Sequence, residues 1–101
     1  MYIYGVTINI NHDVHQDWLK WMREEHIPRV MNTGMFVSHR MCRLIGDADS
    51  GGTTYSIQYI CNNLSDYDRY QKEFAPALQA ESVERYKDKF VAFRTLLEII
   101  D

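Results

Sequence analysis

The sequence predicts an α+β fold in which strands and helices follow the order βαββαβ. The first of three observations is the alternation from Tyr2 to Ile10, in which the even-numbered residues form one apolar face, a pattern typical of a half-buried strand. The second is the helical spacing of apolar residues in two segments, 14–31 and 65–86. The third is the strand-like pattern of residues 35–45, 53–62 and 90–100. We therefore expect the ferredoxin-like arrangement, a four-stranded antiparallel sheet with two helices on one face.

The first helical segment has signals at both of its ends. Asn11 and Asp13 can cap its amino end. Pro28 lacks an amide hydrogen and predicts a kink or a restart of the helix, and Gly34 ends the segment. The two tryptophans could stack on a flat ligand, but their place in a single stripe favours packing in the core. The members of this stripe are Val14, Trp18, Trp21 and Met22.

The second half of the chain repeats the strand and helix signals. The polar, glycine-rich turn GDADSGG joins two strands and predicts a hairpin. Ser65 is the expected cap of the second helix, and Asp66 and Asp68 lie in its first turn, where the helix dipole favours negative charge. Pro76 marks a break in this helix. Its apolar stripe consists of Tyr67, Tyr70, Phe74 and Leu78.

The two faces of the predicted sheet differ in polarity. We expect the helices to cover the more apolar face, and the other face to be semi-polar with several residues unsuited to water. A second copy of the chain packed across that face, with a pocket at its polar centre, would cover them. The expected covered face is Tyr4, Val6, Ile8, Val37, Met41, Tyr55, Ile57, Tyr59, Val91, Phe93 and Leu97. The expected open face includes Thr7, Asn9, Phe36, Ser38, Arg40, Cys42, Leu44, Ser56, Gln58, Ala92, Arg94, Leu96, Glu98 and Ile100.

Length and charge narrow the classes of function. A chain of 101 residues predicts one domain, 1–101, and the net charge of −3 disfavours nucleic-acid and membrane partners. No stripe of Lys and Arg is visible along the sequence. The start, MYIYGVTINI, alternates like a strand and lacks the basic region of a signal peptide. Two cysteines without a secretory signal predict reduced thiols in the cytoplasm, and their places in the hairpin make a disulfide between them implausible.

Three stretches, MYIYGVTINI, WLKWM followed by HIP, and DKFVAFRTLLE, are together similar to a bacterial domain family of unknown function. The element order and the tryptophan and HIP pattern resemble the EthD-like branch of the dimeric α/β-barrel superfamily. The resemblance implies two sheets paired into one barrel, and its relatives include cofactor-independent monooxygenases, isomerases and haem-degrading enzymes. Asn9 matches an early asparagine of the haem-degrading branch. Because no Trp follows position 21 and no His follows position 39, we expect no haem and no other cofactor.

His26 admits two interpretations. It lies beside Glu24, Glu25 and the end of the first helix, where an imidazole can bond the last carbonyl groups. It could instead point into a pocket and act as a general base near neutral pH. The interpretation as a helix end is the simpler one, and His26 is also the candidate catalytic residue.

Asn9, Arg40, Gln58 and Arg94 are the candidate ligand-binding residues. If they share the open face, they form a cationic, donor-rich centre suited to a carboxylate or an enolate. Alternatively, Arg40 or Arg94 pairs with Glu98 and seals the dimer.

We expect no metal site. His12 and His15, with Asp13 and Asp17, have a permissive spacing that a solvated helix end explains equally well. Asp47 and Asp49 begin like a calcium loop, but Gln58 stands where the bidentate Glu belongs.

These observations predict a homodimeric barrel that binds a small anionic or aromatic molecule and can carry out cofactor-independent acid–base chemistry. The alternative is a non-catalytic dimer that serves as a binding or regulatory module. A polar cavity of ligand size would favour the first hypothesis, and a solidly packed interface the second.

Overall fold

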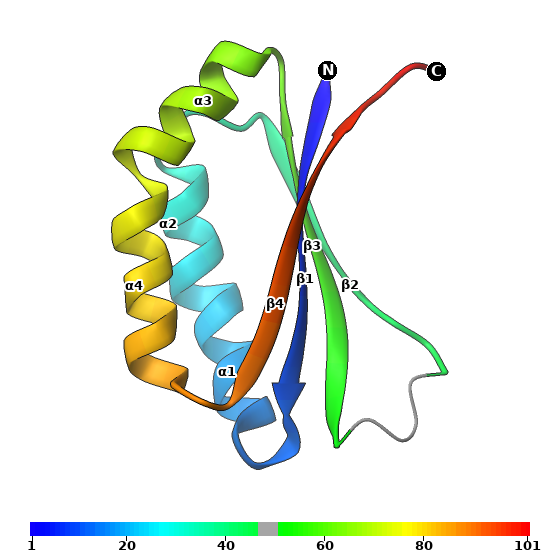
Figure 1. Ribbon diagram of the computed structural model, residues 1–101, viewed down its shortest axis with the longest axis vertical. Helices are drawn as coiled ribbons and strands as arrows, with labels where there is room; N and C mark the ends of the chain where they lie inside the picture. The colour runs from blue at the N-terminus through cyan, green and yellow to red at the C-terminus, as the bar shows by residue number, and fades with distance from the viewer. Residues whose placement is uncertain (47–50) are drawn as a thin grey trace.

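The computed structural model describes residues 1–46 and 51–101, and these residues form one sheet covered by helices on one side (Figure 1). The strands are β1 (Tyr2–Asn11), β2 (Ser38–Arg43), β3 (Gly52–Cys61) and β4 (Phe90–Glu98). They pair antiparallel in the order β2-β3-β1-β4. The helical segments are η1 (His12–Val14), α1 (His15–Trp21), η2 (Met22–His26), α2 (Ile27–Met31), α3 (Leu64–Glu73) and α4 (Ala75–Tyr86). The predicted α+β class and βαββαβ order are confirmed.

The first helical segment, α1–η2–α2, continues without a sharp break through a π-helical turn, η2. This turn comes before Pro28, which lies in the first turn of α2. A π-helical turn holds one residue more than an α-helical turn, so the buried stripe of α1 resumes one position later than α-helical spacing would place it. Ile27 and Val30 are buried as a result, while Glu25 and Arg29 point outward and form an ion pair.

The second helical segment begins two residues earlier than the sequence suggested. The Asn63 side chain accepts a hydrogen bond from the Asp66 amide at 2.9 Å, so Asn63 is the cap of α3. The prediction of Ser65 as cap is wrong, because Ser65 already lies inside the helix and donates from its hydroxyl to Asn63 Oδ1.

The core lies between the sheet and the helices. Trp18 and Trp21 are buried there, with 1% and 4% of their surface exposed, which confirms that they are core residues. Phe36 was expected on the open face, but it is buried against the rings of Tyr4, Tyr59 and Tyr70 because β2 begins only at Ser38.

The assignment of faces for β4 is wrong by one residue. Opposed residues share a face in an antiparallel pair, and Val6 is opposite Arg94 while Ile8 is opposite Ala92. Arg94 therefore lies on the helix-covered face. Val91 and Phe93, expected to be covered, lie on the open face and are 72% and 62% exposed.

The hairpin leaves the two cysteines on opposite faces. Cys42 is opposite Ser56 on the open face, whereas Cys61 is buried on the helix side. Both are free, as predicted. The proposed resemblance of Asp47 and Asp49 to a calcium loop lies outside the described residues.

Candidate functional site

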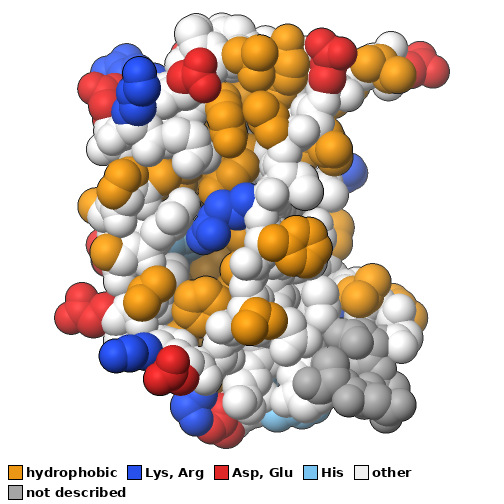
Figure 2. All heavy atoms as spheres, viewed as in Figure 1, with side chains coloured by type: hydrophobic (Ala, Val, Ile, Leu, Met, Phe, Trp, Pro, Cys, Tyr) orange, Lys and Arg blue, Asp and Glu red, His pale blue; other side chains and the backbone are white. Residues whose placement is uncertain are grey.

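A small cavity lies between the sheet and the helices that cover it. Its volume is about 40 Å³, which is room for a few water molecules. Figure 2 shows this side of the molecule, where hydrophobic side chains follow the seam between helices and sheet and a basic side chain lies among them. The apolar walls come from both layers and include Val6, Ile8, Met22, Val30, Ile57 and Leu78.

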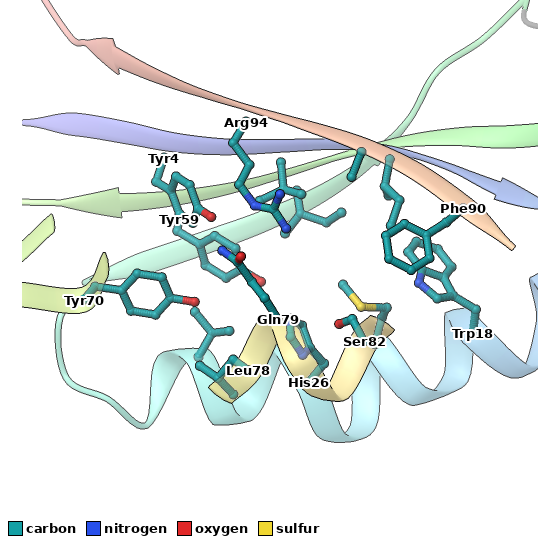
Figure 3. Close-up of a pocket in the computed structure, with 16 residues that line it drawn as sticks. Tyr4, Trp18, His26, Tyr59, Tyr70, Leu78, Gln79, Ser82, Phe90 and Arg94 are labelled. Atoms are coloured by element: carbon teal, nitrogen blue, oxygen red, sulfur yellow. The ribbon is translucent and has the colours of Figure 1, made fainter. Parts of the chain in front are cut away.

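His26 reaches this cavity from the π-helical turn (Figure 3). The extra residue in that turn rotates the following side chains inward, so His26 faces the cavity while its neighbour Glu25 stays exposed. The imidazole lies against the Trp21 ring, with 4.9 Å between the ring centroids. Its Nδ1 atom is buried and has no hydrogen-bond partner among the described residues.

Burial keeps the His26 imidazole neutral. Desolvation lowers its pKa to about 4; nearby Glu81 opposes this shift, and Arg29 and Arg94 add to it. The structure thus places a neutral imidazole in the wall of the cavity. It does not bring a carboxylate within hydrogen-bond distance of that ring, so the acid–base pair that would orient a general base is not formed by the described residues.

Arg94 enters the same cavity from β4, on the side opposite His26 (Figure 3). Its guanidinium makes no ion pair with any described residue, whereas Arg29, Arg69 and Arg85 each contact a carboxylate. An unpaired guanidinium above apolar walls offers up to five hydrogen-bond donors to an anion.

Two phenols complete the polar lining. Tyr59 and Tyr70 line the cavity, and no hydrogen bond of either hydroxyl is found within residues 1–46 and 51–101. Burial raises the pKa of both phenols above the usual value, so both remain protonated donors at neutral pH. The side chains of Gln79 and Ser82 reach the cavity from α4 (Figure 3).

The other predicted binding residues are not brought together with Arg94. Arg40 and Gln58 are opposite each other on the open face, and Arg40 Nε donates to Gln58 Oε1 at 2.8 Å. Asn9 lies on the same face, and its side-chain amide donates a hydrogen bond to Thr54 Oγ1. Thr54 is four residues from Gln58 along β3, so Asn9 is also remote from the Arg40–Gln58 pair. The predicted four-residue centre is therefore split between the two faces of the sheet.

Sequence reasoning missed Tyr59, Tyr70, Gln79 and Ser82 as site residues. The tyrosines were assigned to apolar stripes, and only their hydroxyl groups distinguish them from core residues. Gln79 and Ser82 offered a weak signal, because they stand one helical turn apart beside the buried Leu78.

Three of the four residues with a metal-like spacing, His15, Asp13 and Asp17, have other partners. His15 Nε2 shares a 2.6 Å hydrogen bond with the Tyr55 hydroxyl, and Asp13 pairs with Lys89. The Asp17 carboxylate accepts from the Tyr86 hydroxyl at 2.7 Å. No group of three or more His, Cys, Asp or Glu side chains suited to a metal ion occurs in the described part of the chain.

Solved structures with the same fold cover nearly the whole length of the chain. An EthD family protein from Bacillus halodurans has a TM-score of 0.68 at 11% identity, covering 99% of this chain and 100% of its own. SnoaB, a cofactor-independent oxygenase from Streptomyces nogalater, has a TM-score of 0.69 at 11% identity, with 99% and 94% covered. A dimeric ferredoxin-like protein of unknown function from Thermobifida fusca has a TM-score of 0.58 at 15% identity, with 96% and 92% covered. At these identities the likeness shows the fold alone, the ferredoxin-like α+β arrangement that this chain shares with proteins described as dimeric.

The comparison with curated proteins gives no match. No described helix is both long enough and apolar enough to cross a membrane. A family model described as a domain of unknown function matches residues 1–100. The predicted resemblance to a family of unknown function is confirmed, and the chain belongs to the DUF4286 family.

Proposed function

We propose that this protein is a homodimer that binds a small organic anion in the cavity between its helices and its sheet. One observation carries the proposal: Arg94 and His26 face the same cavity from opposite sides. Arg94 is a cation without an acid partner among the described residues, and Nδ1 of His26 has no hydrogen-bond partner there. A carboxylate or enolate would accept hydrogen bonds from Arg94 and from the phenols of Tyr59 and Tyr70. The compartment we propose is the cytoplasm, since both cysteines are free.

The proposed role of His26 is that of proton acceptor. An anion bound beside the imidazole stabilises its protonated form and raises its pKa. Binding would therefore take up a proton, and the basicity of His26 would increase only when the anion is present. Chemistry of this kind needs no cofactor.

Homodimerisation is supported by two observations. The open face of the sheet exposes Phe93 and Leu97 to solvent. In addition, structurally similar proteins are described as dimeric ferredoxin-like proteins.

Pyruvate is a suitable probe, because it is a small anion whose methyl protons exchange through an enolate. We expect saturable chemical-shift changes of residues around the cavity on titration with pyruvate. We also expect the protein to accelerate exchange of the methyl protons in D₂O, measured by proton NMR. Arg94→Gln should weaken pyruvate binding by about tenfold or more, as the loss of a charge-assisted contact predicts. Arg40→Gln is the matched control, since Arg40 lies on the opposite face of the sheet.

The result distinguishes the two hypotheses. Exchange that is lost in His26→Gln supports acid–base chemistry. Binding without exchange supports the binding or regulatory module, which the small volume of the cavity and the lack of a described carboxylate at His26 favour. If pyruvate fails to bind, or binds equally well to Arg94→Gln, the proposed site is wrong.

A further inference from the structure

A second, larger groove lies on the other side of the core, between edge strand β2 and the helical segment α1–η2–α2. Its volume is about 520 Å³, within the range of binding sites. The groove combines the basic residues Arg23, His39 and Arg43 with an apolar floor of Leu19, Ile27 and Met41. No sequence motif predicts this groove, because its basic residues come from separate segments.

The groove is basic in a protein whose net charge is −3. Among the residues that the structure describes, no Asp or Glu lines it. Within the described ranges, Arg23, Arg40 and Arg43 make no ion pair, while the arginines elsewhere on the helices are paired with carboxylates. Like charges that gather without counter-charges repel one another, and an anionic partner relieves that repulsion.

Strand β2 also offers backbone groups for pairing. It forms one edge of the sheet. The Leu44 amide donates to the Thr54 carbonyl at 2.8 Å, and hydrogen-bonded pairs alternate along an antiparallel ladder. The backbone groups of His39, Met41 and Arg43 consequently point away from β3, toward the free edge. An edge of this kind can accept an extended peptide as an additional strand.

We propose that β2 and its groove bind an extended acidic segment of a partner protein, which adds a fifth strand to the sheet. The side chains of His39, Met41 and Arg43 lie on the groove side, because their opposed residues in β3 face the helices. An added strand would therefore present alternate residues to the groove. The chemistry favours an apolar residue beside Met41 and acidic residues on either side of it, toward Arg43 and Arg23 at one end and His39 at the other.

Charged residues on an edge strand also have a simpler role, since they prevent edge-to-edge association. Charge reversal separates the two roles. The probes are two fluorescently labelled peptides, acetyl-TETVTET-amide and acetyl-TKTVTKT-amide, measured by fluorescence anisotropy against the full chain.

We expect the glutamate peptide to bind and the lysine peptide not to bind. Arg43→Glu should weaken binding of the glutamate peptide by about tenfold or more and allow the lysine peptide to bind. Arg69→Glu is the matched control, because Arg69 is an exposed, paired arginine of α3, outside the groove. Amide hydrogen exchange should slow at His39, Met41 and Arg43 when the glutamate peptide is present, and circular dichroism checks that each variant is folded.

Three outcomes would overturn the proposal. The first is that neither peptide binds, which leaves edge protection as the role of the arginines. The second is complete competition by inorganic pyrophosphate together with unchanged amide exchange, which indicates a site for small polyanions. The third is that Arg43→Glu dissociates the homodimer, because the groove would then be occupied by a second copy. None of these outcomes bears on the cavity that contains His26.

Discussion

His26 is the residue whose environment departs most from the one suggested by its neighbours in sequence. Two glutamates precede it, yet the imidazole turns away from them into an apolar cavity. The folded state therefore favours the neutral ring, with a pKa of about 4. The unfolded chain restores the ordinary value of about 6.5.

This difference makes stability depend on pH. Between pH 6.5 and 4 the unfolded state binds a proton at His26 and the folded state does not, so the free energy of unfolding falls as pH falls through this range. We expect the wild type to lose about 2 kcal/mol more than His26→Gln between pH 7 and pH 4.5. Urea unfolding at both pH values measures the loss, and carboxylates contribute equally to both proteins. Equal losses would mean that the imidazole is not buried.

The face of the sheet on which Arg94 lies could not be predicted from single positions of the sequence. The residue type of Arg94 suggests an anion contact, which stays a prediction. Phe90, Ala92 and Leu96 on one side of β4 are nearly as apolar as Val91, Phe93 and Leu97 on the other. Only the register with β1 determines which set the helices cover.

At the scale of elements, the number, type and order of the strands and helices could be predicted, because period-two and helical patterns are strong along most of the chain. The ends of elements could not. Met35–Val37 has a strand-like composition, but Phe36 packs under the helices and β2 starts after it. The π-helical turn has no signal other than Pro28, and it is this turn that directs His26 into the cavity.

The cap of α3 provides a test at this scale. Asn63→Ala removes the acceptor of the Asp66 amide and should lower the free energy of unfolding by about 1 kcal/mol. Ser65→Ala is the matched control and should change it by less than about 0.5 kcal/mol, as expected for an exposed position that is not the cap. Urea denaturation of the two variants measures the difference, and the reverse ranking would restore Ser65 as the cap.

For the whole molecule, the uncovered face of the sheet is the dominant feature. Helices cover one face only (Figure 1). The other face carries Val91, Phe93 and Leu97, all more than half exposed, around the polar pair Arg40 and Gln58. The sequence predicts a semi-polar open face, and that description holds even though its members on β4 had to be exchanged. That a second copy covers this face stays a prediction.

Charge on that face should separate the subunits. We expect Phe93→Glu to shift the protein from dimer to monomer at micromolar concentration, because a carboxylate buried without a partner is costly. Val83→Glu is the control, since Val83 is 51% exposed on α4 and lies away from the sheet. Analytical ultracentrifugation distinguishes the two states. A wild type that sediments at the 12.0 kDa mass of one chain would show that the face is not an interface.

The contact between Trp21 and His26, 4.9 Å between ring centroids, has an optical consequence. A protonated imidazole quenches the fluorescence of an indole next to it, whereas a neutral one does so much less. Trp18 also lines the cavity, so both indoles of the chain are close to the proposed site. The protein consequently carries its own fluorophores for proton uptake and for ligand occupancy, and Trp18→Phe or Trp21→Phe would assign each signal to one of them without an added dye.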